Sequence, residues 1–496
     1  MTTKRDVLLM AIPLMQTKQP APAIYHLKGQ LTAGGVTCMA LDANIILYNK
    51  MKDGWEEISR LLQWRNSRDN TDDVLYERVL KAMEDIVNDS IIRTDPEWIG
   101  VSIFSRNSRR LGKDLLSFIR SKFPNKKLII GGMGLGDSMG DTKFEYAVEL
   151  FELGLVDYYI TGEAELNIVE LICNNTTRPG INSPMKQIMQ LEELAFADYT
   201  DCDHDLYPFS EYDSGLPTYV LTGSRGCVRR CDFCDVYRLW PKFKSRGGEH
   251  IAKEMIYHYE QRGVYNFSFS DSLINGNMKT FRELVDILID NQKKIDVKFR
   301  WGGQFICRSD WQMPLEDYIK ASNAGLESVG IGLEHASERI RKLMRKGFDH
   351  DALHDTIHNL SKSNIRSTMN MMSGHPSETE DDHNENLKFL ESYKWASDNG
   401  TIAGLVFFET AFLPGTDFFD KKDELVEQDV GPFWKNDIIN FPLIHKRRKQ
   451  MGDRCAELGW HIYGELQYMD KEFWRRELEY YNETVAKTRS PNSLET

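Results

Sequence analysis

The sequence of 496 residues contains only 8 cysteines and has no long apolar run, and each shortage excludes a class of protein. No apolar stretch approaches the roughly 20 residues of a membrane-spanning helix, and the run at residues 7–14 predicts a buried strand. The cysteines lack the spacing of a disulfide framework, which indicates a reducing compartment. We therefore expect a cytoplasmic protein that does not bind membranes.

Positive charge is also scarce, because 62 Lys and Arg residues face 75 Asp and Glu residues and leave a net charge of −13. This balance argues against general binding to a phosphate backbone, so nucleic acid is an unlikely partner. Basic residues gather locally at 106–110, 242–246 and 445–449, and the simplest interpretation of each stretch is a solvated face.

The length is too great for a single ordinary core, and we expect three parts: residues 1–200, 201–420 and 421–496. In the first part, apolar runs alternate with segments of helical period. The expected strands are 7–14, 37–41, 98–104, 127–130 and 156–160. This order predicts an α/β, doubly wound, Rossmann-like domain.

The second part repeats strand and helix more regularly. The expected strands are 218–224, 264–270, 297–303, 327–333, 365–372 and 402–409. Six such units predict a partial (β/α)6, TIM-like barrel with its site at the carboxyl ends of the strands. The last part predicts a helical C-terminal extension, with helices near 445–458 and 470–487.

The strongest chemical signal is Cys227, Cys231 and Cys234, which stand in C-x3-C-x2-C spacing directly after an expected strand. From the cysteine frequency, this spacing would arise by chance roughly 0.002 times in such a chain. Three thiolates on one loop can hold three corners of a cuboidal iron–sulfur cluster and leave one iron open to a small molecule. A zinc site, the alternative, would need a fourth ligand, and neither His204 nor His250 stands at a typical spacing.

This loop resembles the signature of the radical S-adenosylmethionine (SAM) superfamily. In that family the open iron of a [4Fe-4S] cluster binds the amino and carboxylate groups of SAM, and the reduced cluster cleaves SAM to a 5′-deoxyadenosyl radical. The resemblance implies that Cys227, Cys231 and Cys234 hold the cluster and that Phe233 lies close to the adenine. It also implies an electron donor such as flavodoxin or ferredoxin.

Further motifs at the ends of later strands resemble the same family. Asp271 would help to hold the SAM amino group, although an Asp before a helix is also a common N-cap. The segment I-G-L-E ending at Glu334 resembles an I-G-x-E segment near the SAM ribose or amino group. Gly374 and Pro376 belong to a loop that resembles G-x-P-x-E-T and would bring backbone close to SAM. The sequence departs from the family at His335, where Ser is usual, and a packed or solvated histidine is the simpler interpretation.

The N-terminal domain resembles the cobalamin-binding domain of cobalamin-dependent radical SAM enzymes. Gly131 and Gly132 end the fourth expected strand, and Gly162 and Glu163 follow the fifth. Gly-Gly alone would suggest only a turn, so the resemblance depends on the order of these motifs. No D-x-H-x-x-G motif is present, and no lower axial histidine is therefore expected. A domain that keeps the fold without binding cobalamin is the alternative.

Together these motifs favour a cobalamin-dependent methyltransferase that acts on an unactivated carbon or phosphorus centre of a small-molecule or biosynthetic-intermediate substrate. A second hypothesis keeps the radical chemistry but performs a non-methylating oxidation, ring contraction or cyclisation. A non-catalytic redox or cofactor-binding protein is the third. A methylthiotransferase is disfavoured, because the N-terminal domain lacks three cluster-forming cysteines.

Overall fold

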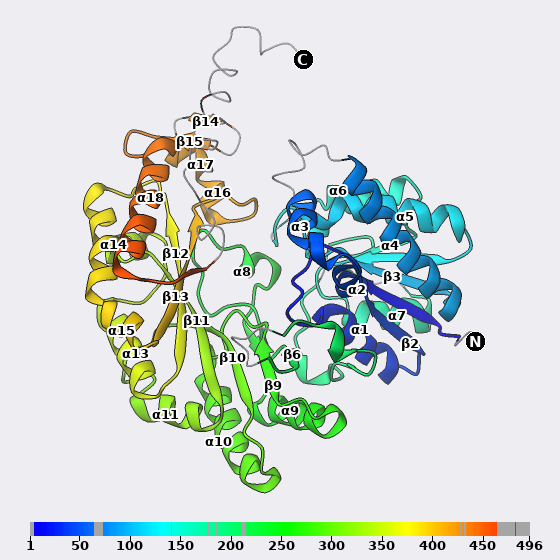
Figure 1. Cartoon of the computed structure of the whole chain (residues 1–496), viewed down its shortest axis with the longest axis horizontal. Helices are drawn as coiled ribbons and strands as arrows, with labels where there is room; N and C mark the ends of the chain where they lie inside the picture. The colour runs from blue at the N-terminus through cyan, green and yellow to red at the C-terminus, as the bar shows by residue number, and fades with distance from the viewer. Residues whose placement is uncertain are drawn as a thin grey trace. The chain divides into compact units, whose positions relative to one another are not determined.

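The computed structural model describes residues 4–63, 73–139, 141–176, 179–184, 186–209, 215–426, 428–430, 433–463 and 482 (Figure 1). The chain divides into two compact units. The first unit comprises residues 1–226 and 236–268, and the second comprises residues 227–235 and 269–496. Among the described residues, no helix is long and apolar enough to cross a membrane.

The first unit contains a five-stranded parallel sheet, as the apolar runs predicted. Its strands are β1 (Val7–Ala11), β2 (Cys38–Asp42), β3 (Trp98–Ser102), β4 (Lys127–Gly131) and β5 (Tyr158–Ile160). They lie in the order β2-β1-β3-β4-β5, so the direction of winding reverses between β1 and β3. The doubly wound, Rossmann-like prediction is therefore confirmed, and ligands of such sheets bind near the carboxyl ends of the strands at this reversal.

Helices cover both faces of this sheet. They are α1 (Pro22–Ala33), α2 (Ala43–Lys50), α3 (Trp55–Leu62), α4 (Asp73–Thr94), α5 (Arg109–Lys122), α6 (Glu145–Glu152) and α7 (Glu165–Asn174). Helix α1 packs on α7, whereas α4 packs on α2, α3 and α5. Leu8, Met10 and Ile12 join the apolar core that includes α2 to α6, and all five residues of β1 are buried. Strands buried on both faces explain why the sequence shows continuous apolar runs rather than alternation.

The first unit also contains the two strands that begin the predicted barrel. These are β6 (Thr218–Leu221) and β9 (Asn266–Phe269), of which only Phe269 belongs to the second unit. The side-chain amide of Asn266 donates a hydrogen bond of 2.6 Å to the Thr218 hydroxyl. Helix α9 (Gly248–Arg262) precedes β9.

The second unit contains the other four predicted barrel strands. They are β10 (Arg300–Phe305), β11 (Leu326–Glu334), β12 (Arg366–Ser373) and β13 (Ile402–Glu409), all parallel to their neighbours. The connecting helices include α10 (Met278–Ile295), α11 (Leu315–Asn323), α13 (His350–Lys362) and α14 (Glu380–Ser392). Figure 1 shows these four helices along the same side of the strands. All six strands of the predicted barrel are thus present, and the three-part domain division stays a prediction.

The C-terminal extension is helical, as predicted, but it also adds strands. Helix α18 (Phe441–Leu458) includes the predicted segment, while most of 470–487 lies outside the described residues. The unpredicted strands are the antiparallel pair β14 (Gln428–Val430) and β15 (Phe433–Lys435), and β16 (Ile462–Tyr463), which extends the sheet beyond β13. Gly404 allows this extension, because a side chain there would meet the Tyr463 ring within 2.8 Å.

Candidate functional site

Backbone hydrogen bonds fix the cysteine loop within the second unit. The Cys234 amide donates to the Cys231 carbonyl over 3.2 Å, and the Asp232 amide donates to the Met344 carbonyl over 3.3 Å. The Asp232 carbonyl in turn accepts from the Phe418 amide at 2.9 Å. The loop is therefore held between the end of α12 (Glu338–Leu343) and the start of α16 (Asp417–Asp420).

The three thiols differ in exposure, with Cys231 buried and Cys227 and Cys234 half-buried. The Arg229 amide donates to Cys227 Sγ over 3.3 Å, and hydrogen bonds to sulfur tune clusters. Burial raises the pKa of the Cys231 thiol to about 12, although the Lys346 charge opposes this rise. Within the described part of the chain, no three His, Cys, Asp or Glu side chains gather closely enough to hold one metal ion. A cuboidal cluster fits this donor set better than zinc does, because each thiolate binds a different iron.

Phe233 lies beside the buried side chains of Ile340, Met344 and Met372. The Lys346 ammonium lies 5.9 Å from the centre of its ring. The aromatic residue that sequence analysis placed near the adenine is thus packed against α12 and β12.

Glu334 ends β11 in a left-handed conformation, with φ of +63°, where the register with β12 shifts between Gly332 and Glu334. Its carboxylate forms an ion pair of 2.6 Å with Lys346, and both side chains are largely buried. Burial disfavours the Lys346 charge, but the Glu334 carboxylate together with the Cys231 and Cys234 thiols outweighs this effect and raises the pKa of Lys346. Sequence analysis missed Lys346, which stands on the segment that also binds the cysteine loop.

The loop after β12 forms a tight turn closed by its own glutamate. Gly374 has φ of +89°, and its amide donates to Glu378 Oε2 over 2.8 Å. The Glu378 amide donates back to the His375 carbonyl at 2.8 Å. Burial raises the pKa of Glu378, although the Gly374 amide and the Arg447 charge oppose this rise. The Pro376 carbonyl accepts a hydrogen bond of 2.9 Å from Asn436.

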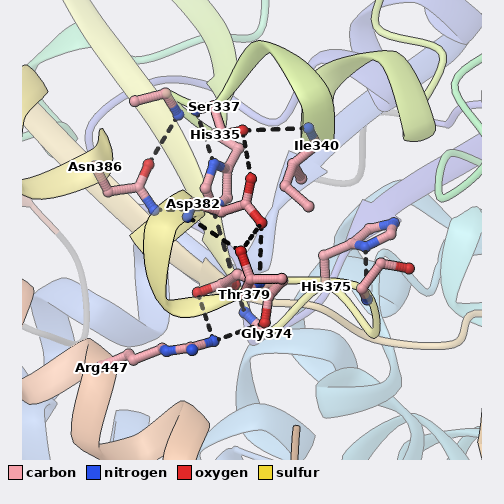
Figure 2. Close-up of polar contacts among 12 residues, drawn as sticks. His335, Ser337, Ile340, Gly374, His375, Thr379, Asp382, Asn386 and Arg447 are labelled. Carbon is pink, nitrogen blue, oxygen red and sulfur yellow. Dashed lines mark hydrogen bonds and ion pairs between the residues drawn. The ribbon is translucent and has the colours of Figure 1, made fainter. Parts of the chain in front are cut away.

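His335 lies in a buried polar network that Figure 2 shows beside the same turn. The Ser337 amide donates to His335 Nδ1 over 3.0 Å, and His335 Nε2 lies 2.9 Å from Asn386 Nδ2. The Ser337 hydroxyl donates to Asp382, which completes a capping box with Thr379 at the start of α14. His335 is fully buried, and burial lowers its pKa to about 3. The packed interpretation of this histidine therefore fits the structure.

Asp271 follows β9 and is buried, with 4% of its surface exposed. It belongs to the second unit, like the cysteine loop, Glu334 and Gly374. The structure joins the cysteine loop to the segment that carries Lys346, and joins Lys346 to Glu334. A contact between Asp271 and SAM stays a prediction.

In the first unit, the two glycines after β4 have different surroundings. A Cβ at Gly131 would meet only the Ile160 carbonyl oxygen, at 3.6 Å, which is an ordinary contact. Gly132 has φ of +108°, and a Cβ there would clash with the Ile103 carbonyl. Gly132 is thus required by the fold itself, whereas Gly131 leaves open backbone at the strand end. Gly162 also has a positive φ, of +65°.

The Glu163 carboxylate has partners within its own unit. It forms a buried ion pair of 2.6 Å with Arg225 and accepts from the Trp240 indole at 3.1 Å. The Ile188 amide donates to its other oxygen. Glu163 therefore connects three segments of the first unit, and its expected contact with a cofactor stays a prediction that these contacts do not favour.

Comparison with known proteins agrees with this architecture. Residues 221–390 match the Radical SAM superfamily. An anaerobic magnesium-protoporphyrin IX monomethyl ester cyclase from Synechocystis sp. is 23% identical over 266 residues, which cover 51% of this chain and 51% of that protein. The chain thus spans about half the length of this curated relative.

Two solved structures share the fold over most of the chain. The radical S-adenosylmethionine methyltransferase TsrM from Kitasatospora setae, with cobalamin and a [4Fe-4S] cluster bound, superposes with a TM-score of 0.60 at 14% identity, covering 87% of this chain and 82% of that one. The cobalamin-dependent S-adenosylmethionine radical enzyme OxsB gives a TM-score of 0.64 at 14% identity, covering 98% of this chain and 71% of that one. Residues 221–390 therefore form a radical SAM domain, and the chain as a whole shares the fold of TsrM and OxsB.

Proposed function

We propose that this protein is a cobalamin-dependent radical SAM methyltransferase that acts on an unactivated carbon or phosphorus centre of a small-molecule substrate. When bound, a [4Fe-4S] cluster with SAM would supply a 5′-deoxyadenosyl radical, and cobalamin would supply the methyl group. The chain's own part is to bind these groups, orient them and exclude water from them.

The observation that carries the proposal is the cysteine loop. It offers Cys227, Cys231 and Cys234 as ligands on one short segment, and none of the three forms a disulfide. Such a set would leave one iron open for SAM. The loop is bound through its backbone to Met344 and Phe418, which fixes the segment that carries the three cysteines.

SAM would bind beside this loop through groups on neighbouring strand ends. Glu334 would accept hydrogen bonds from the ribose or amino group, and Lys346 would hold the Glu334 carboxylate in place. Gly374 and Pro376 would bring this turn close to SAM, and Glu378 closes the turn by accepting from the Gly374 amide. Asp271 would complete the set from the end of β9.

Cobalamin would bind at the carboxyl edge of the sheet in the first unit. Gly131 supports this assignment, because its surroundings leave space beside the backbone at the end of β4. The order of the strands supports it too, because ligands of such sheets bind near the carboxyl ends of the strands where the winding reverses, here between β1 and β3. The sequence contains no D-x-H-x-x-G motif, so no histidine of such a motif would help to hold the cofactor. TsrM and OxsB, which share the fold, are described with cobalamin bound.

A non-methylating reaction is the second candidate. The observation in its favour is that the relative from Synechocystis sp. is named a cyclase. Such an enzyme would use the same cysteine loop and SAM site.

The products of SAM distinguish these candidates. After anaerobic reconstitution with iron, sulfide and hydroxocobalamin, a methyltransferase should produce both S-adenosylhomocysteine and 5′-deoxyadenosine under reducing conditions. 5′-Deoxyadenosine alone would favour the non-methylating reaction. Neither product, from a protein that carries the cluster and binds SAM, would contradict both enzymatic proposals.

A further inference from the structure

The C-terminal extension contacts the turn that the proposed function assigns to SAM. Arg447 on α18 donates from Nη1 to the Glu378 carbonyl over 3.0 Å and lies 3.3 Å from Glu378 Oε1. Its Nη2 donates to Glu380 Oε2 over 3.1 Å. Figure 2 shows the Arg447 guanidinium directed at the turn that contains Gly374. One side chain of the extension therefore holds both the main chain and the carboxylate of the residue that closes the turn.

The ion pair between Arg447 and Glu378 is buried, so its loss should affect the turn that Glu378 closes. The side chains of Arg447 and Glu378 are 4% and 1% exposed, so the buried Glu378 carboxylate depends on the Arg447 charge for compensation. Removing one partner of a buried pair leaves the other uncompensated. Glu378 Oε2 also accepts from the Gly374 amide, so a displaced carboxylate would release the turn.

Two further contacts link the extension to the same turn. The Asn436 amide group donates to the Pro376 carbonyl and to the Leu425 carbonyl, both at 2.9 Å. Ile444 covers Gly374 so closely that a Cβ there would lie 2.8 Å from its Cδ1. Ile444 itself packs with Trp434 and Ile439 in a separate small core.

From these contacts we propose that the segment 434–447 is a clamp that positions the turn 374–378 for SAM, with Arg447 and Asn436 as positioning residues. The proposal rests on the proposed SAM site and adds that the extension sets its affinity. Arg447 touches neither the cysteine loop nor, in this account, SAM. Loss of the clamp should therefore weaken SAM binding without preventing cluster assembly.

The test compares SAM affinity, cluster content and thermal midpoint in the reconstituted full-length protein. Arg447→Ala should weaken SAM binding about 10-fold or more, because it frees the Glu378 carboxylate, with iron and sulfide content unchanged. Arg447→Lys should recover part of the affinity, since it keeps the charge but loses the planar fork that reaches two partners. Asn436→Ala should weaken binding by a smaller factor without altering any charge.

Arg454→Ala is the matched control. Arg454 lies on the same helix and pairs with Glu391 of α14 at 2.5 Å, but it does not contact the turn. Its removal should leave SAM affinity unchanged.

Different results would contradict the proposed SAM site and the clamp. A wild-type protein that carries the cluster but does not bind SAM would contradict the proposed function. Wild-type binding with equal affinity in Arg447→Ala would overturn the clamp alone. If Arg447→Ala lost cluster, thermal midpoint and affinity together while Arg447→Lys and Asn436→Ala bound SAM normally, Arg447 would only stabilise the fold, and the clamp would again be overturned.

Discussion

The Lys346 ammonium lies 2.6 Å from the Glu334 carboxylate, and Gly332 is the residue that leaves room for the pair. A Cβ at Gly332 would lie 2.6 Å from Lys346 Nζ and would clash with Glu334 Oε1. Both clashing atoms are the ends of side chains, so the pair would move while the strand remained folded. The ion pair and the glycine thus form one arrangement at the end of β11.

Gly332→Ala should therefore weaken SAM binding about 10-fold, because it displaces the carboxylate that is expected to contact SAM. Equilibrium binding to the reconstituted protein measures this effect. Gly452→Ala on α18 is the control, since a Cβ there meets nothing within 4 Å. Equal SAM affinity in Gly332→Ala and the wild type would show that the pair does not shape the site.

Glu334→Gln and Asp271→Asn should each weaken SAM binding while the cluster still assembles. A lost hydrogen bond to a charged group costs about 1.5–3 kcal/mol, which corresponds to roughly 10- to 150-fold in affinity. Glu338→Gln, which changes a partly exposed carboxylate at the start of α12, should have no effect. Unchanged affinity in both site variants would mean that SAM binds elsewhere.

The buried His335 predicts a stability that depends on pH. Its pKa is about 3 in the folded protein and 6.5 when exposed, so between these values the unfolded chain binds a proton that the folded chain excludes. The contribution of the neutral, buried His335 to the free energy of unfolding is therefore fully present above pH 6.5 and is lost as the pH falls below that value. Between pH 7 and pH 5 this titration should reduce the free energy of unfolding by about 2 kcal/mol.

Denaturant unfolding of the wild type and His335→Gln at both pH values measures this difference. The variant should lose about 2 kcal/mol less than the wild type between pH 7 and pH 5. The buried His375 remains in both proteins, so its contribution cancels. His350→Gln, at an exposed position on α13, should behave like the wild type. Identical pH dependence in His335→Gln and the wild type would contradict the assignment.

Gly131→Val should abolish corrinoid binding and leave the first unit folded. A Cβ fits at this position, so a bulkier side chain would block ligand rather than distort the sheet. Binding of hydroxocobalamin, followed by its absorption spectrum, gives the result, with Gly54→Ala as a control where a Cβ meets nothing within 4 Å. If the wild type retains no corrinoid, the domain has the cobalamin fold without the ligand, and the non-methylating reaction becomes the leading proposal.

Sequence reasoning located most strands of both units, because parallel strands buried on two faces produce continuous apolar runs. It missed α2, α3 and α7, and β16, whose two residues are too short for any periodic signal. Their positions depend on what they pack against rather than on local pattern.

The residues of the site also divide into those that a local pattern shows and those that only the fold brings together. The cysteine loop is a local motif and could be read directly. Lys346 lies 12 residues from Glu334, and Arg447 lies 69 residues from Glu378, so only the fold brings these pairs together. Glu163 was chosen for its motif, yet its carboxylate binds Arg225 and Trp240 within its own unit. Its expected contact with a cofactor stays a prediction, because a motif alone does not show which partners a carboxylate has in the fold.

The most direct test of the central claim is the formation of 5′-deoxyadenosine from SAM by the anaerobically reconstituted, reduced protein. The wild type should produce it, and Cys227→Ala, Cys231→Ala and Cys234→Ala should not, because each removes one of three cluster ligands that no other cysteine can replace. Cys173→Ala, at an exposed cysteine of the first unit, should keep full activity. A triple variant lacking Cys227, Cys231 and Cys234 that still cleaved SAM to 5′-deoxyadenosine would contradict the account.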